Sequence, residues 1–402
     1  MNTRITLLLL AATHAASAAG FQLHERSASG LGRAFSGEAA MGDDASVIAS
    51  NPAAMVLLPD DWTFSSGVSG IFPEVEVSGT FTLPQGVRLP ALGGNVASDA
   101  ALPYLYVAKR LNEQLVLGFG SFTTFGLETN YPVGFAASSL GDFSKLTTFN
   151  LNPSLAWQIN EQWSLGAGFD ALYADGTLTS TLGGVRPLLD LAGDDWGYGF
   201  NVGLLYKPAE HTRLGLHYRS AIDLELEGRA ISVLPAFNGP ATLATELPDS
   251  VEFSVVQDIG AWSIHGDAMW TNWSKFQQLA PFITGAPAQP PATQENWKDS
   301  WRFALGSTWR ATDAWTFRAG IAYDHTPVPE GGRTLRIPDA DRLWLSAGFS
   351  WDFAPCWTLD AGYVHIFAED ALIIEGSSAT GKFVGRATGA GDVVSVGLTT
   401  RF

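Results

Sequence analysis

Hydrophobic and polar residues alternate with a period of two through most of the chain after residue 60. In the segment 315–323 every odd position is hydrophobic, three of the five being aromatic, whereas the even positions carry Thr, Arg, Gly and Ala. This period predicts β-strands, because successive side chains of a strand point to opposite faces. Glycine and arginine on one face cannot pack a dry core. The pattern therefore indicates a barrel with a polar interior and its aromatic face against lipid.

Pairs of tryptophans flank three of the expected turns. Trp157 and Trp163, Trp309 and Trp315, and Trp351 and Trp357 each stand six positions apart across a polar or proline-containing segment. Tryptophan prefers the boundary between hydrocarbon and water, where its ring is buried and its N–H remains hydrated. Repeated pairs at tight turns are typical of the interfacial girdle of a membrane β-barrel.

The turns give a strand count. Six short turns are expected, at 111–113, 160–162, 208–210, 258–260, 311–313 and 354–355. Seven longer Gly- and Pro-rich segments are expected, at 82–99, 127–145, 180–195, 229–248, 274–299, 324–341 and 367–390. Thirteen connections predict an all-β fold, a fourteen-stranded antiparallel transmembrane β-barrel, and bacterial single-chain barrels have even strand numbers.

The amino terminus has the features of a secretory signal. Arg4 is followed by an apolar core at 5–12 and by the small residues Ala16, Ser17 and Ala18, so residues 1–18 are predicted to be a signal peptide. No later stretch reaches the roughly 20 apolar residues of a membrane-spanning helix. Any spanning structure must then consist of strands, which we place at 59–402.

Residues 19–58 do not share the strand pattern. They are rich in small residues and have hydrophobic residues at helical spacing, so we expect short helices and turns. A fourteen-stranded barrel is either a water channel or filled. We therefore expect these forty residues to form an amino-terminal helical hatch that plugs the barrel.

Composition excludes several functions. The 402 residues carry a formal net charge of −17, which argues against binding nucleic acid, whose phosphates require a basic surface. Cys356 is the one cysteine, so no internal disulfide is expected. No His/Cys cluster suggests a metal, and we expect no cofactor.

Several ordered segments resemble the FadL outer-membrane long-chain fatty acid transporters. The segments that carry this resemblance are 19–23 (AGFQL), 29–34 (SGLGRA), 51–53 (NPA), 270–274 (WTNWS), 276–279 (FQQL), 315–318 (WTFR), 327–329 (PVP) and 337–342 (IPDADR). They cover essentially the whole chain after the predicted signal peptide. The chain is identified as a member of this family by resemblance.

The resemblance implies a passive transporter in the bacterial outer membrane, which we expect to be a monomer. A hydrophobic small molecule, above all a long-chain fatty acid, would be captured among the outer loops, pass to a pocket inside the barrel and leave sideways into outer-membrane lipid. The implied exit is a kink in the third strand, near 114–127, with Thr124, Phe125 and Gly126 at the kink. The hatch segment Asn51, Pro52 and Ala53 would lie beside it, and Asn51 would bind backbone groups freed by the kink; alternatively, Asn51-Pro52 is a simple turn.

The resemblance also implies a head-group site. Phe21 matches the hatch phenylalanine, whose early backbone N–H faces the ligand, and Lys298 matches a pocket lysine, unless it is simply a solvated lysine at the base of a loop. Ser180 stands where the family has a pocket arginine and supplies no charge. A neutral aromatic hydrocarbon is therefore an alternative substrate.

Three other classes compete with transport of hydrophobic compounds. An outer-membrane enzyme could use Asp324 and His325 at the barrel rim, but two adjacent residues do not make a catalytic constellation, so we expect no enzyme. A general porin would lack the hatch and conduct ions steadily. A structural or adhesive barrel would have no role in uptake.

Overall fold

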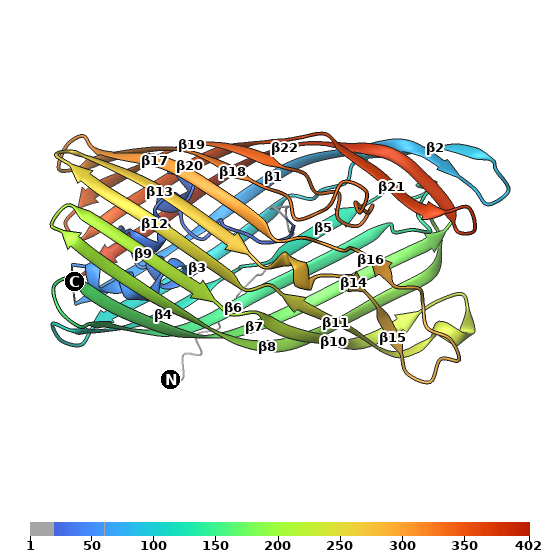
Figure 1. The fold of residues 1–402 in the computed structure, drawn as a ribbon, viewed down its shortest axis with the longest axis horizontal. Helices are drawn as coiled ribbons and strands as arrows, with labels where there is room; N and C mark the ends of the chain where they lie inside the picture. The colour runs from blue at the N-terminus through green and yellow to red at the C-terminus, as the bar shows by residue number, and fades with distance from the viewer. Residues whose placement is uncertain (1–19, 60) are drawn as a thin grey trace, which may run out of the picture.

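The chain forms a closed antiparallel β-barrel of fourteen transmembrane strands, filled at one end by amino-terminal residues (Figure 1). The computed structural model describes residues 20–59 and 61–402. The predicted signal peptide, 1–18, lies outside the described residues. The barrel closes where the first and last strands pair continuously, from Thr63 opposite Arg401 to Thr82 opposite Lys382. The predicted fold class and strand number are confirmed.

The wall consists of consecutive hairpins, and several of its fourteen strands are interrupted and carry two labels, among them β4 and β5, β9 and β10, and β11 and β12. The wall strands are β1 (Trp62–Thr82), β3 (Ala100–Arg110), β4 (Leu115–Phe122), β5 (Gly126–Asn130), β6 (Phe143–Gln158), β7 (Trp163–Leu182), β8 (Arg186–Ala209), β9 (Thr212–Arg219), β10 (Ile222–Ile231), β11 (Gly239–Leu247), β12 (Ser250–Ile259), β13 (Trp262–Thr271), β17 (Ser300–Arg310), β18 (Trp315–Asp324), β19 (Arg342–Ala354), β20 (Trp357–Ala368) and β22 (Gly381–Arg401). Two further strands extend the wall: β2 (Arg88–Asn95) continues β3 along β1, and β21 (Ala371–Ser377) continues β20 along β22. The short strands β14 (Gln278–Leu279), β15 (Pro281–Ile283) and β16 (Thr293–Gln294) belong to the connection between β13 and β17.

Bulky hydrophobic side chains face outward around the wall, as the alternation predicts. Trp262 stacks on Trp309 with ring centroids 5.4 Å apart, and Trp315 stacks on Trp351 at 5.5 Å, all four exposed near the short turns. Arg318, between outward-facing neighbours, is buried inside the barrel. The outward aromatic face and the inward arginines are both confirmed.

The six short turns lie where the sequence predicts them, and they gather at one end of the barrel (Figure 1). Several of the seven predicted long loops contain strand, and 180–195 is almost entirely strand. The β7–β8 ladder continues to Leu182 opposite Arg186, and Gly183 and Gly184 make the turn with φ of +66° and +74°.

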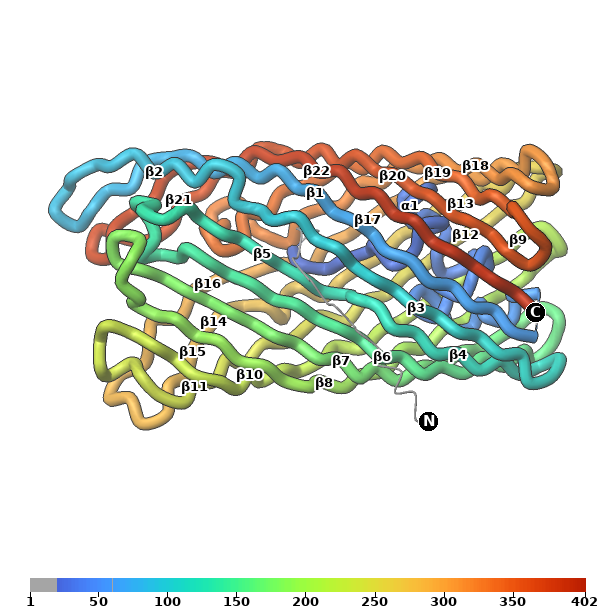
Figure 2. The backbone as a smooth tube through the Cα atoms, turned by 180° about the vertical axis from the view of Figure 1, so that it is seen from behind, coloured from blue at the N-terminus to red at the C-terminus, as the bar shows by residue number. Residues whose placement is uncertain are grey.

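The amino-terminal segment 20–58 lies inside the barrel at the turn end and is almost entirely buried (Figure 2). We call it the hatch. Its helices are α1 (Ala28–Leu31), η1 (Glu38–Ala40), α2 (Val47–Ser50) and η2 (Pro52–Leu57), and the remaining helices, η3 (Pro235–Phe237) and η4 (Trp273–Lys275), belong to long connections. No helix among the described residues is long and apolar enough to cross a membrane.

Arginines of the wall hold the hatch through its backbone carbonyls. Arg302 donates to Ala34 O at 2.6 Å, Arg219 to Ala49 O at 3.0 Å, and Arg401 to Asp43 O at 2.9 Å. A buried carbonyl needs a donor, and a charged donor gives a stronger bond than a neutral one. The inward arginines of the alternating pattern therefore hold the hatch in the lumen.

Candidate functional site

The third transmembrane strand is interrupted at the predicted kink. β4 ends at Phe122 and β5 begins at Gly126, and both pair with β6. Three residues, 123–125, stand opposite only Thr148 and Phe149, so the register shifts by one residue, as at a β-bulge. Thr148 Oγ1 donates to Phe125 O at 2.6 Å and accepts from its N–H at 3.2 Å.

On its other side, the third strand separates from its neighbour β3. The ladder between β3 and β4 runs from Leu105 opposite Ser121 to Arg110 opposite Val116. Toward the loop end, the next pairing between the two strands is the isolated bridge between Ala97 and Thr129. Residues 98–104 and 122–128 form no ladder pair with one another in the described chain. Backbone hydrogen bonds therefore do not hold the wall closed over this stretch, which we call the wall gap.

The start of the hatch pairs with the interrupted strand from inside the barrel. Leu23 N–H donates to Thr124 O at 2.8 Å, and Gly126 N–H donates to Phe21 O at 2.9 Å, on either side of an antiparallel bridge between Gln22 and Phe125. Residues 21–23 act as a one-bridge strand that satisfies the backbone groups the bulge leaves unpaired. The predicted interruption at Thr124, Phe125 and Gly126 is present, and the hatch covers it.

An aromatic cluster holds this hatch strand. Phe21 is 3% exposed, and its ring centroid lies 4.7 Å from Trp273, 5.3 Å from Phe276, 5.7 Å from Trp297 and 6.0 Å from Phe125. Three of these contacts are edge-on, a geometry that favours aromatic pairs. We call these five residues the aromatic cage. Phe21 thus anchors residues 21–23 beside the interrupted strand.

Asn51 does not bind the backbone groups freed at the kink, contrary to the prediction. Its Nδ2 donates to Ala39 O at 2.6 Å and to Leu204 O of β8 at 3.2 Å, while its Oδ1 caps Ala53 N–H at 3.0 Å. A Cβ added at Gly203 of β8 would stand 1.8 Å from Asn51 Oδ1. The segment Asn51–Pro52–Ala53 thus starts η2 and fixes the hatch against β8, because hatch residues 21–23 already occupy the kink.

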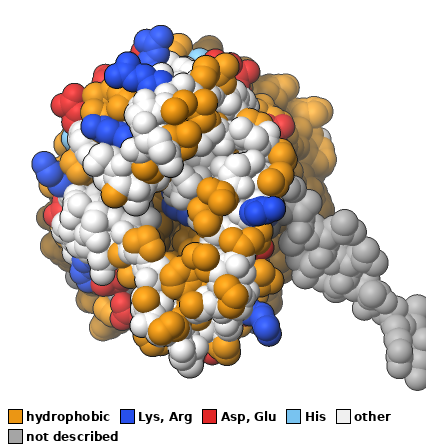
Figure 3. Space-filling view, turned by 90° about the vertical axis from the view of Figure 1, so that its right-hand side faces the viewer, with side chains coloured by type: hydrophobic (Ala, Val, Ile, Leu, Met, Phe, Trp, Pro, Cys, Tyr) orange, Lys and Arg blue, Asp and Glu red, His pale blue; other side chains and the backbone are white. Residues whose placement is uncertain are grey.

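A cavity of about 530 Å³ opens among the long loops at the other end of the barrel. Leucines and Phe237 form much of its lining, and Ser180, Arg336 and Glu375 contribute polar atoms. Figure 3 views this end and shows hydrophobic side chains gathered around a hollow. Ligand pockets commonly have volumes of about 300–1,000 Å³ and combine apolar walls with a few polar groups. Ser180 lines this cavity, and its role in substrate binding stays a prediction.

A buried apolar interior connects the cavity to the aromatic cage. One contiguous cluster includes Phe21 and Phe125, and Leu178, Leu189, Phe237 and Leu279 of the cavity lining belong to it or pack against it. Inward-facing leucines of β7, β8, β10 and β11 fill the space between. The lumen between the loop end and the cage is thus apolar, whereas the lumen at the turn end is filled by the hatch and carries the arginines that hold it.

The charged groups of the cavity differ from the prediction. Lys298 is exposed, and only its backbone N–H is engaged, with Pro327 O at 2.9 Å. Its neighbour Trp297 is buried instead, among the rings of the aromatic cage. The buried cation at the cavity is Arg336, 6% exposed, whose Nη1 donates to Phe143 O and Ser144 Oγ.

Two carboxyl groups near the cavity are buried. Burial raises the pKa of Glu295 to about 8 and that of Glu375 to about 7. Glu295 accepts a bond from Trp297 Nε1 at 3.1 Å, and Glu375 from Leu335 N–H at 2.7 Å. These two groups and Asp142 lie close enough to Arg336 to favour its charge, but none of the three forms an ion pair with it among the described residues.

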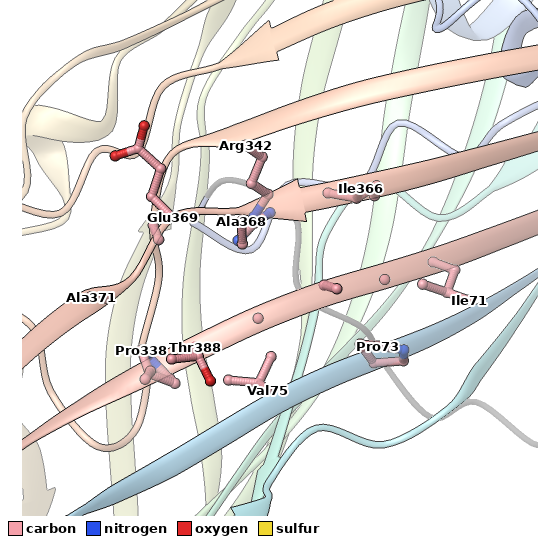
Figure 4. A pocket seen from close by; sticks show the side chains of 15 residues that line it. Ile71, Pro73, Val75, Pro338, Arg342, Ile366, Ala368, Glu369, Ala371 and Thr388 are labelled. Atoms are coloured by element: carbon pink, nitrogen blue, oxygen red, sulfur yellow. The ribbon is translucent and has the colours of Figure 1, made fainter.

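A second irregularity of the wall lies between β20 and β21. Ile71, Pro73, Ile366 and Arg342 line a cavity of about 40 Å³ there (Figure 4). The β1–β22 ladder is continuous past this point. A space this small holds little more than water, so it is not a route for an alkyl chain.

Sequence reasoning did not identify Arg336, Glu295 or the cage residues Trp273, Phe276 and Trp297. They belong to long connections that have no period, so no pattern marks them as buried. The one signal available was the abundance of aromatic residues in 270–276.

Comparisons with known proteins agree with this architecture. Residues 9–402 match the family described as outer membrane protein transport protein (OMPP1/FadL/TodX). The chain is 37% identical over 395 residues to the long-chain fatty acid transport protein of Salmonella typhi, with 89% of each chain covered. A solved FadL homologue of Pseudomonas aeruginosa superimposes with a TM-score of 0.89 at 24% identity, covering 96% of this chain and 100% of that one. The toluene transporter TbuX of Ralstonia pickettii superimposes with a TM-score of 0.71 at 19% identity, covering 94% of this chain and 98% of that one.

The two solved structures show the shared fold. The family match spans nearly the whole chain, and the Salmonella relative is similar along most of its length. The chain therefore belongs to the OMPP1/FadL/TodX family of bacterial outer-membrane transport proteins.

Proposed function

We propose that this protein is a passive transporter of hydrophobic small molecules, with long-chain fatty acids as its main substrates. Substrate is captured in the 530 Å³ cavity, moves through the apolar interior and leaves through the wall gap into outer-membrane lipid. The observation that carries this proposal is the hatch strand 21–23, which covers the interrupted third strand at the bottom of the apolar interior.

The energetics support a sideways route. An alkyl chain gains about 0.8 kcal/mol for each methylene removed from water. A path that leads from apolar lumen directly to lipid keeps this gain, whereas a water-filled pore would lose it. At the turn end of the barrel the lumen is filled by the hatch, whose buried side chains pack against the wall.

The proposal assigns a role to each part of the chain. Residues 1–18 direct export, 19–58 form the hatch and 59–402 form the barrel, which works as a monomer. Thr124, Phe125 and Gly126 are the wall side of the gate, and Phe21 is its hatch side. Asn51, Pro52 and Ala53 keep the rest of the hatch in place while the gate opens. The protein has no catalytic role in this scheme.

A neutral aromatic hydrocarbon is the second candidate substrate. Ser180 brings no charge to the cavity, and one structural neighbour is a toluene transporter. A ligand without a head group would need only the apolar lining and the gate.

Uptake by whole cells tests the proposal. Cells that lack their own fatty acid uptake protein are expected to accumulate labelled oleate when they express this chain. Toluene uptake, measured in the same cells, separates the two substrate classes. A large steady ion conductance in planar bilayers without uptake of either compound would show a porin and contradict the proposal.

A further inference from the structure

Arg336 is a buried cation that has no ion-pair partner among the described residues. Its side chain lines the loop-end cavity and is 6% exposed. Of its guanidinium nitrogens, only Nη1 makes hydrogen bonds, to Phe143 O at 3.2 Å and to Ser144 Oγ at 3.1 Å. Both acceptors are neutral. A buried charge is costly unless an opposite charge compensates it.

The acidic groups around Arg336 favour its charge from a distance, but their hydrogen bonds go to other groups. Asp142 accepts from the hydroxyls of Thr179 and Thr181, Glu295 accepts from Trp297, and Glu375 accepts from Leu335 N–H. None of the three forms an ion pair with Arg336 within the described chain. The guanidinium therefore retains donors for an anion that enters the cavity.

The backbone around Arg336 is fixed in advance. Thr129 Oγ1 donates to Arg336 O at 2.8 Å, and Tyr131 OH donates to Leu335 O at 2.9 Å. These bonds come from β5 and from the residue that follows its end, so they tie the loop to the upper part of the third strand. A preformed donor binds a ligand with less loss of conformational entropy than a mobile one.

We propose that Arg336 holds the carboxylate of a hydrophobic acid in the loop-end cavity and thereby makes this protein select acids over neutral hydrocarbons. The alkyl chain lies along the leucines of the cavity and points toward the apolar interior. This inference rests on the proposed function. It places the head-group charge on a loop arginine, since Ser180 has none and Lys298 is exposed.

Ligand binding to the purified full-length protein in lipid nanodiscs tests the inference. The wild type is expected to bind oleate more tightly than methyl oleate, which has the same chain without the charge. Arg336→Gln is expected to weaken oleate binding about ten- to a hundredfold, the range of a lost charge-assisted hydrogen bond. Its affinity for methyl oleate should stay within about twofold. Arg336→Lys, which keeps the charge but not the planar fork, should fall between the two.

Lys382→Gln serves as the matched control, because it removes an exposed cation at the same end of the barrel that does not line the cavity, and it should change neither affinity. Arg333→Gln removes a second, half-buried arginine of the cavity, where water screens the charge, and should have a smaller effect than Arg336→Gln.

The outcomes separate the inference from the function on which it rests. Equal loss of oleate and methyl oleate binding in Arg336→Gln, or no loss, overturns the head-group role. If that variant does not fold, equal affinity of the wild type for oleate and methyl oleate overturns it instead. A wild type that binds neither ligand nor toluene contradicts the proposed function itself.

Discussion

Replacement of Phe21 with alanine should release the hatch strand from the interrupted wall. Phe21 is 3% exposed and contacts four aromatic rings, with centroids 4.7–6.0 Å away. Truncating a phenylalanine at such a site costs about 3–5 kcal/mol. The two backbone bonds of this strand, at about 0.5–1.5 kcal/mol each, cannot compensate for that loss.

Hydrogen exchange of two backbone amides measures this release. Leu23 N–H and Gly126 N–H donate the bonds that join hatch and wall, so both exchange only when the strand separates. In Phe21→Ala their exchange should accelerate by roughly a hundredfold or more, up to the rate of an unprotected amide. Amides of the β7–β8 ladder should keep their protection.

Phe317→Ala is the matched control, because Phe317 faces outward from β18 with 42% exposure and does not touch the hatch. Unchanged exchange at Leu23 and Gly126 in Phe21→Ala would refute the reasoning, since the cage would then not be what holds the hatch strand.

Two further predictions concern the hatch seat and the loop cluster. Gly203→Val should displace Asn51, because an added Cβ would stand 1.8 Å from its Oδ1, and the variant should show a higher ion conductance in planar bilayers. Gly331→Ala is the control, because a Cβ at Gly331 meets nothing within 4 Å, and its conductance should not rise. Equal conductance of the two variants would contradict this role of Asn51. The pKa values of Glu295 and Glu375 are about 8 and about 7, above the ordinary 4.5. The two protonated side chains therefore contribute fully to the stability of the loops below pH 4.5, and this contribution is lost as the pH rises through 7 and 8. Protease cleavage in the long loops should therefore increase between pH 6 and 9, and Glu295→Gln should abolish the part of the increase near pH 8; an unaltered profile would show that Glu295 does not titrate there.

The wall of the barrel is predictable from the sequence because its signal is local. Alternation along β17 and β18 specifies which face meets lipid, and the turn residues 311–313 specify where the chain reverses. Each of these features depends on residues that are close in the sequence, so periodicity carries them. The ends of the hairpins are less well specified by local patterns. The loop predicted at 180–195 is wrong for this reason, because β7 and β8 remain paired there.

The candidate site depends on contacts that no local pattern contains. Phe21 meets Phe125, Trp273 and Trp297 only because the hatch lies inside the closed barrel. Resemblance located the interruption at Thr124, but the role it suggested for Asn51 at the kink was wrong.

The two cations show the same limit of sequence reasoning. Lys298 and Arg336 both lie in loops, and only the packed structure shows that Lys298 is exposed and Arg336 buried. The roles of Ser180 and Lys298 in substrate binding stay predictions.

A reversible lock of the hatch strand tests the sideways exit most directly. Gln22 and Phe125 form an antiparallel bridge, and such pairs have Cα atoms about 4.5–5.5 Å apart, within the range of a disulfide. In a Cys356→Ser background, the double variant Gln22→Cys/Phe125→Cys should take up labelled oleate when reduced, stop when oxidised, and recover when reductant is added. Uptake that continues unchanged with the disulfide fully formed would contradict release through the wall gap.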